Sequence, residues 1–138
     1  MILQPTMLNG YLVRTWFGDD AAWDAVVDVL KTVTADGYLA AIEPISDSAF
    51  DGAEPGQILS AVVRQPWMSI LTIADEVALT APDRPVLILS LVDPANNKPF
   101  RCTAVALPLM ECNLSEANVG WSDLERDTDA DGVFRGFG

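Results

Sequence analysis

The chain contains no histidine among its 138 residues, and its 8 lysines and arginines are outnumbered by 20 aspartates and glutamates. The missing histidine removes the side chain that most often acts as a general base or binds a transition metal. The net charge of −12 argues against nucleic acids and anionic membranes as partners, because both are bound through basic surfaces. The same charge favours a basic protein partner, and it is equally compatible with a surface that only keeps the protein in solution.

Cysteines and long apolar runs are also scarce. Cys102 and Cys112 form no C-x-x-C pair and have no histidine to activate them, so we expect two reduced, mostly buried thiols. No apolar run approaches the roughly 18 residues of a membrane-spanning helix. The first residues lack the basic and apolar parts of a signal peptide. We therefore expect a cytoplasmic protein without a disulfide.

The motifs of several enzyme classes are missing as well. The sequence has no G-x-x-x-x-G-K-[ST], no G-x-G-x-x-G and no G-x-S-x-G, which mark phosphate loops, dinucleotide-binding folds and serine hydrolases. A serine or cysteine nucleophile would have only carboxylates, Lys31 or Lys98 as its base. These absences favour a role other than catalysis, although paired carboxylates leave acid–base chemistry open.

The composition is that of a globular protein, since half of the residues are hydrophobic and a fifth are charged. A chain of this length buries roughly 68% of its unfolded surface, so we expect residues 1–138 to form a single α/β domain. Within this domain, residues 1–10 are a lead-in. Residues 127–138 form an acidic turn followed by a tail of aromatic residues and glycines.

Strand and helix patterns alternate along the chain. Runs of β-branched, aromatic or continuously apolar residues predict strands at residues 11–17, 38–45, 68–74, 86–92 and 100–107. Apolar residues at helical spacing, with caps, prolines or a glycine at the ends, predict helices at residues 19–36, 55–64, 108–118 and 121–126. Residues 75–83 fit either a short helix or the end of a strand. We predict a mixed, mostly parallel sheet of about five strands, with flanking helices, a β-hairpin and short C-terminal helices.

Acidic residues follow nearly every predicted strand. Asp19 and Asp20 come after the first strand and Asp75 after the third, and ligands of parallel α/β sheets bind at these carboxyl ends. Oxygen ligands of this kind suit Mg²⁺. An aspartate that caps a helix belongs at the same positions, however. The pattern therefore leaves two interpretations open, a magnesium site and a set of helix caps.

A second acidic motif lies near the C-terminus. Asp127, Asp129 and Asp131 alternate and are followed by Gly132, as in the first half of an EF-hand calcium loop. The twelfth position of such a loop, which needs a bidentate glutamate, is Gly138. The motif therefore predicts either weak Ca²⁺ binding or a plain acidic turn. Apart from weak binding of Mg²⁺ at the strand ends or of Ca²⁺ at this motif, we expect no cofactor.

Exposed aromatic residues next to acidic loops are typical of interface hot spots. The candidates for partner binding are Trp67, Trp121, Phe134, Arg135 and Phe137. Our leading hypothesis is a non-enzymatic protein-binding or regulatory domain that engages a basic protein, as an inhibitor or immunity protein does. The alternatives are a Mg²⁺-dependent enzyme that acts on a phosphorylated small molecule through the strand-end carboxylates, and a structural subunit without a ligand of its own.

Five segments resemble a family of small acidic proteins that is common in actinobacteria and classed only as a domain of unknown function. They are LVRTWFGDDAAW, the FDG at Phe50–Gly52, ALTAPDRPVLILSL, the NLSEAN at Asn113–Asn118 and DADGVFRGF. The resemblance covers most of the chain. It implies a single α/β domain and no particular activity.

Overall fold

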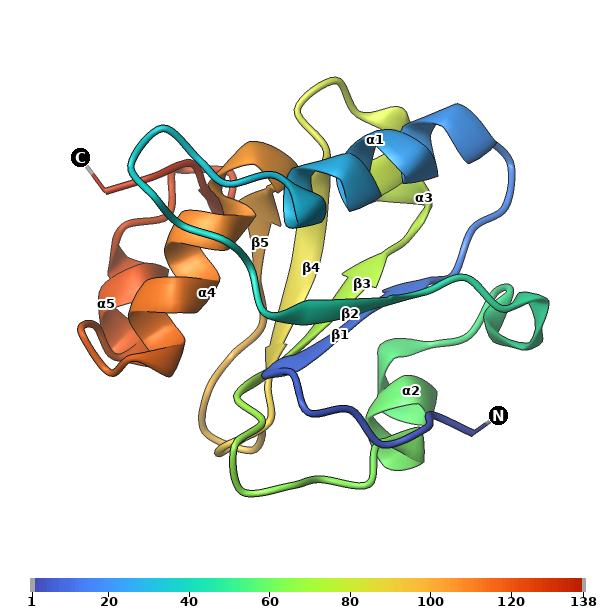
Figure 1. Cartoon of the computed structure of the whole chain (residues 1–138), viewed down its shortest axis with the longest axis horizontal. Helices are drawn as coiled ribbons and strands as arrows, with labels where there is room; N and C mark the ends of the chain where they lie inside the picture. Colours follow the sequence, from blue (N-terminus) through green and yellow to red (C-terminus); the bar gives the residue numbers. More distant parts are fainter. Residues whose placement is uncertain (1, 138) are drawn as a thin grey trace.

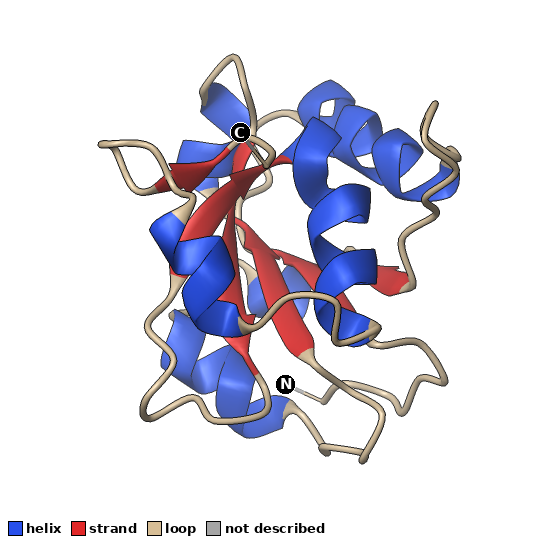
Figure 2. Ribbon diagram, turned by 90° about the vertical axis from the view of Figure 1, so that its left-hand side faces the viewer, coloured by secondary structure: helices blue, strands red, loops and turns tan. Residues whose placement is uncertain are grey.

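A mixed six-stranded sheet with helices on both faces forms the centre of the computed structural model, which describes residues 2–137 (Figures 1 and 2). The strands are β1 (Gly10–Arg14), β2 (Ile42–Ile45), β3 (Ile70–Ala74), β4 (Pro85–Ser90), β5 (Phe100–Thr103) and β6 (Val133–Phe134). The α-helices are α1 (Asp20–Lys31), α2 (Pro55–Ala61), α3 (Glu76–Thr80), α4 (Leu107–Ser115) and α5 (Trp121–Arg126). Two short 3₁₀ helices are η1 (Ser48–Phe50) and η2 (Ala104–Ala106).

The strand order is β2-β1-β3-β4-β5-β6. β1 pairs in parallel with β2 and β3, β4 is antiparallel to both of its neighbours, and β6 is parallel to β5. The single α/β domain with a mixed sheet, flanking helices, a hairpin and short C-terminal helices is confirmed. The sheet has six strands where about five were predicted, and the prediction that it is mostly parallel is wrong. The segment between β3 and β4 contains only the short α3 and is too short for the crossover that a parallel pair requires.

Alternation along the strands divides the buried side chains into two clusters. Leu12 of β1 and Ile88 of β4 belong to one cluster with Trp23, Val26 and Met110, which come from α1 and α4. The neighbouring β1 residues face the opposite side of the sheet, where the second cluster lies under η1 and α2. This second cluster includes Tyr11, Val13, Phe50, Ile58, Leu71 and Leu89. Each fully buried side chain of this size contributes about 1.5–3 kcal/mol, so burial on both faces stabilises the sheet.

The first helix begins where it is predicted to begin but ends early. Asp19 caps it by accepting a hydrogen bond from the Ala22 amide, as expected of aspartate before a helix. The helix ends at Lys31, before the predicted end at Asp36-Gly37. Val33 therefore leaves the apolar stripe that Trp23 and Leu30 form, and its side chain is 57% exposed.

The predicted strand at residues 100–107 is also shorter than expected. β5 ends at Thr103, after which η2 leads directly into α4. Pro108 occupies the first turn of that helix, where its missing amide hydrogen has no helical partner to lose. Both cysteines are free thiols, and burial raises the pKa of Cys102. No helix within residues 2–137 is long and apolar enough to cross a membrane.

Glu111 of α4 is a buried carboxylate, only 1% exposed. Its Oε1 accepts a hydrogen bond from the Ala41 amide, and its Oε2 accepts from Asn9 Nδ2 at 3.2 Å and from Ser115 Oγ at 2.6 Å. Ser115 Oγ in turn contacts Ser69 Oγ at 3.0 Å. Because Asn9, Ala41 and Ser69 each precede a strand, this carboxylate fixes α4 to the amino ends of β1, β2 and β3.

Candidate functional site: an apolar groove bordered by carboxylates

A hollow of the described surface lies between α1, η2 and the turn that joins α3 to β4. It has a volume of about 420 Å³. A second hollow of about 260 Å³ shares Val29 and Val105 with it and continues to Val33, so the two form one groove along α1. The walls of this groove are Ala25, Val26, Val29, Val33, Pro82, Ala104 and Val105.

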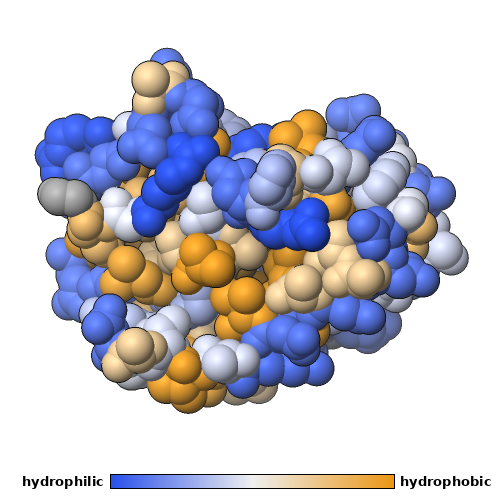
Figure 3. Space-filling model, turned by 90° about the horizontal axis from the view of Figure 1, so that it is seen from above, coloured by the Kyte–Doolittle hydropathy of each residue, from blue (hydrophilic) through white to orange (hydrophobic). Residues whose placement is uncertain are grey.

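The groove presents large apolar side chains to solvent. Val105 is 74% exposed and Val33 is 57% exposed, and Figure 3 shows hydrophobic side chains gathered across the middle of this face, between hydrophilic ones. Ala25 and Val29 lie one helical turn apart on α1 and form a second apolar stripe beside the one that packs in the core. Val33 lies beyond the end of the helix and continues this stripe, since it lines the second hollow together with Val29. A continuous exposed stripe of this kind is typical of an interaction surface.

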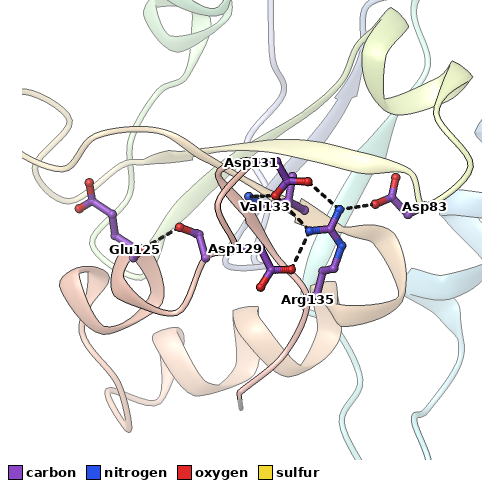
Figure 4. A network of polar contacts seen from close by, with 7 residues as sticks. Asp83, Glu125, Asp129, Asp131, Val133 and Arg135 are labelled. Atoms are coloured by element: carbon purple, nitrogen blue, oxygen red, sulfur yellow. Dashed lines mark hydrogen bonds and ion pairs between the residues drawn. The ribbon is translucent and has the colours of Figure 1, made fainter.

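Charged residues close one end of the groove. Arg135 of the C-terminal tail lies against Asp83 of the α3–β4 turn and against Asp129 and Asp131 (Figure 4). Its Nη1 donates to Asp129 Oδ2 at 2.7 Å and to Asp131 Oδ1 at 3.0 Å, and its Nη2 donates to Asp131 Oδ2 and Asp83 Oδ2, both at 2.9 Å. We call these four residues the Arg135 cluster. Three carboxylates surround one guanidinium, so the cluster keeps a surplus of negative charge.

The Arg135 cluster has a direct electrostatic consequence. The hydrogen bonds from Arg135 lower the pKa of Asp131, and the carboxylates, Asp131 first, raise the pKa of Arg135. The cluster also joins the tail to a turn 52 residues away in the sequence. Gly132, with a φ of 78°, makes the tight turn that brings Asp131 and Arg135 together.

The half EF-hand motif is thus arranged around an arginine. Asp129 and Asp131 direct their carboxylates at Arg135 (Figure 4), whereas Asp127 follows the last residue of α5 and its amide donates to the Asp123 carbonyl. Gly138, the twelfth position of the motif, lies outside the described residues. Among residues 2–137, cysteine and acidic side chains form no group of three or more that could hold a metal ion.

The strand-end acids make contacts of their own. Asp19 caps α1, and Asp20 receives Nη2 of the buried Arg14 at 2.8 Å. Asp75 caps α3 and binds Arg101 through both oxygens, at 3.0 and 2.8 Å. The structure therefore places these three predicted residues at helix caps and ion pairs rather than in one shared cluster.

The family model described as Domain of unknown function (DUF6924) matches residues 9–137. The chain belongs to this family. The match agrees with the resemblance that the five sequence segments suggested. None of the curated proteins matches the chain.

The aromatic candidates of this DUF6924 domain lie in different environments. Trp121 is only 8% exposed, packs edge-on against Phe100 at 4.9 Å, and donates its indole N–H to the Lys98 carbonyl. Phe134 is fully buried and contacts Phe137, which is 42% exposed. Trp67 is 41% exposed and donates to the Thr6 carbonyl. Arg135, Phe137 and Trp67 are therefore the members of the predicted partner-binding set that solvent reaches.

The groove itself was not predicted from the sequence. The signal for it is the second stripe on α1, since Ala25 and Val29 precede Val33 at four-residue spacing. The other wall, Val105, carries no such signal because it lies in a run of apolar residues that reads as a buried strand. Thr103 also lines the groove, and its buried hydroxyl has no hydrogen-bond partner within residues 2–137.

Proposed function

We propose that this DUF6924 domain is a non-enzymatic protein-binding module that engages a basic protein partner. The observation that carries the proposal is the apolar groove along α1, with Val33 and Val105 exposed and carboxylates at its border. In this arrangement, apolar side chains of the partner fill the groove. Basic side chains of the partner contact the acids around it.

The charges around the groove support a basic partner. Asp28 and Asp83 line the groove together with Arg84 and Arg135. Asp129 and Asp131 add two carboxylates through the Arg135 cluster, so acids still outnumber bases at this border. The net charge of −12 steers a cationic protein toward this surface and makes its association rate fall as salt increases. An inhibitor that covers a cationic surface, such as that of a nuclease, is one form this function takes.

The other predicted functions receive less support. A Mg²⁺-dependent enzyme needs strand-end carboxylates that are free to share an ion, whereas Asp20 and Asp75 each bind an arginine. A structural subunit without a ligand of its own would not need an exposed apolar groove. The cytoplasmic location and the actinobacterial setting of the family stay predictions.

Substitution of Val105 by aspartate tests the proposal. About three quarters of this side chain is free to be buried by a partner, which corresponds to about 1–2 kcal/mol and about 5–30-fold in affinity. Val63, which is 59% exposed and lies after α2 outside the groove, supplies the matched control Val63→Asp. All three proteins are immobilised, incubated with extract from the source cells at about 50 and about 300 mM NaCl, and the captured proteins are identified by mass spectrometry.

We expect a basic protein that the wild type and Val63→Asp retain at low salt, that high salt releases, and that Val105→Asp fails to retain. Capture that both aspartate variants reduce equally would show that the groove is not the binding surface and would contradict the proposal. Partners that are neutral or acidic, or retention that ignores salt, would contradict the proposal.

A further inference from the structure

A separate cavity lies at the carboxyl ends of β1 and β3, on the face of the sheet that α2 covers. It has a volume of about 280 Å³ and shares no lining residue with the groove. The end of β1, the turn before α2 and the start of α3 form its walls. The residues that define its chemistry are Thr15, Trp16, Asp51, Glu54, Asp75 and Glu76.

Thr15 is a buried polar residue in this wall. It is 6% exposed, and its hydroxyl donates to and accepts from no other group within residues 2–137. Strand alternation places its side chain on the same face as Tyr11 and Val13, which is the face of this cavity. Its main chain is fixed, because its amide donates to the Ala74 carbonyl at 3.0 Å and its carbonyl accepts from the Gly52 amide at 2.9 Å. Among residues 2–137 the Thr103 hydroxyl is the buried side-chain atom without a partner, so solvent in the cavity reaches the Thr15 hydroxyl. It is therefore held in place and open to a ligand.

The charge of the cavity is negative and uncompensated. Asp51, Glu54 and Glu76 form no ion pair in the described part of the chain, and none of the lining residues is basic. Asp75 is different, because Arg101 binds both of its oxygens. Because Asp51, Glu54 and Glu76 are exposed acids without a basic partner, their charge favours a cationic ligand at this cavity.

Trp16 adds an aromatic wall. A Cβ atom at Gly18 would lie 2.2 Å from Cζ2 of the Trp16 ring, so the glycine allows the ring to pack closely on the main chain. An aromatic face next to carboxylates favours an organic cation, which contacts the ring through its methylene groups and its charge. A bare metal ion fits less well, since the acids of residues 2–137 form no group that could hold one.

We propose that this cavity binds the ammonium group of a small aliphatic amine. An ammonium has three N–H donors, which match the Thr15 hydroxyl and the free carboxylates of Glu54 and Glu76. The aliphatic stem lies along Trp16. The location at the carboxyl ends of parallel strands is where α/β sheets bind their ligands. This inference does not depend on the proposed protein partner.

Calorimetric titration with 1,5-diaminopentane tests the site. The controls are 1,5-pentanediol, an uncharged probe of the same shape, and MgCl₂, the metal probe, and all titrations are made at matched ionic strength. The variants are Thr15→Val and Glu76→Gln, which preserve shape. Asp24→Asn, at an exposed acid on α1 outside the cavity, is the control. Thermal unfolding verifies that each variant is folded, and the indole N–H signals of the four tryptophans report where the probe binds.

We expect saturable binding of the diamine, no binding of the diol, and a shift of the Trp16 indole signal alone. Thr15→Val and Glu76→Gln should each weaken binding about tenfold or more, because each removes a hydrogen bond that involves a charged group. Asp24→Asn should bind as the wild type does. Equal weakening by all three variants, equal binding of the diol, or a response that MgCl₂ reproduces would overturn the proposal.

Discussion

Replacement of Glu111 is the perturbation whose size follows most directly from the structure. The carboxylate accepts three hydrogen bonds, from Ala41, Asn9 and Ser115, and is 1% exposed. Glutamine keeps an acceptor for the Ala41 amide but places an NH₂ group against the other two donors. Since a hydrogen bond to a charged group contributes about 1.5–3 kcal/mol and a neutral one about 0.5–1.5 kcal/mol, Glu111→Gln should lower the free energy of unfolding by about 2 kcal/mol.

Alanine at position 111 should lower the free energy of unfolding more than glutamine does. It leaves the Ala41 amide and Asn9 Nδ2 without this acceptor, whereas Ser115 Oγ keeps its contact with Ser69 Oγ. Each unsatisfied buried group costs about 1–3 kcal/mol, and the lost side chain adds a cavity. We expect Glu111→Ala to lose about 4–5 kcal/mol, a large share of the roughly 5–15 kcal/mol that a domain possesses. Equilibrium urea unfolding measures both variants. Glu116→Gln, at an exposed acid just after α4, is the control and should stay within about 0.5 kcal/mol of the wild type.

The order of stability decides whether this account of Glu111 is correct. A free energy of unfolding that falls from the wild type to Glu111→Gln and further to Glu111→Ala agrees with it. A glutamine variant as stable as the wild type would refute it, because the cost of burying the charge would then cancel the hydrogen bonds it makes.

Three further predictions follow from other contacts. Arg135 lowers the pKa of Asp131 in the folded protein. The Asp131 carboxylate therefore stabilises the fold at pH values above its unfolded pKa of about 3.9, and it loses this effect as the pH falls through the lower folded pKa. In urea titrations, the difference in stability between wild type and Asp131→Asn should thus be constant near neutral pH and shrink below about pH 4. Phe134 is fully buried in β6, so Phe134→Ala should destabilise the domain by about 3–5 kcal/mol, and a loss below about 1 kcal/mol would show that the tail is not packed in the core. Since the described acids form no metal-holding group, Mg²⁺ and Ca²⁺ should raise the unfolding temperature no more than NaCl of equal ionic strength, and a saturable shift with one of the two ions would contradict this.

Local patterns predicted most of the elements because most strands and helices have a clear period and clear ends. Residues 86–92 read as a buried strand and cover all of β4 except Pro85, and Asp19 marks the start of α1. The sequence did not reveal β6, whose two residues are too short to show any period. It also did not reveal the direction of β4, which depends on the length and path of the preceding segment rather than on its own residues.

The candidate site was harder to predict because it depends on which distant residues meet. The alternating acids of residues 127–131 suggest a cation, and only the fold shows that Arg135 is that cation and that Asp83 joins it. Asp131 and Arg135 are four residues apart, a spacing that could have suggested their pairing. Trp121 looked like an exposed anchor, but packing against Phe100 buries it. Thr15 gave no signal, since an unpaired hydroxyl becomes visible only when all neighbours are placed.

The affinity of the captured partner for the domain, measured by calorimetry at about 50 and about 300 mM NaCl, tests the central claim most directly. Our account predicts a dissociation constant that rises with salt and that Val105→Asp raises further by at least about fivefold at both salt concentrations, while Val63→Asp leaves it unchanged. An affinity that responds to neither salt nor Val105→Asp would show that the groove and its carboxylates are not the binding surface.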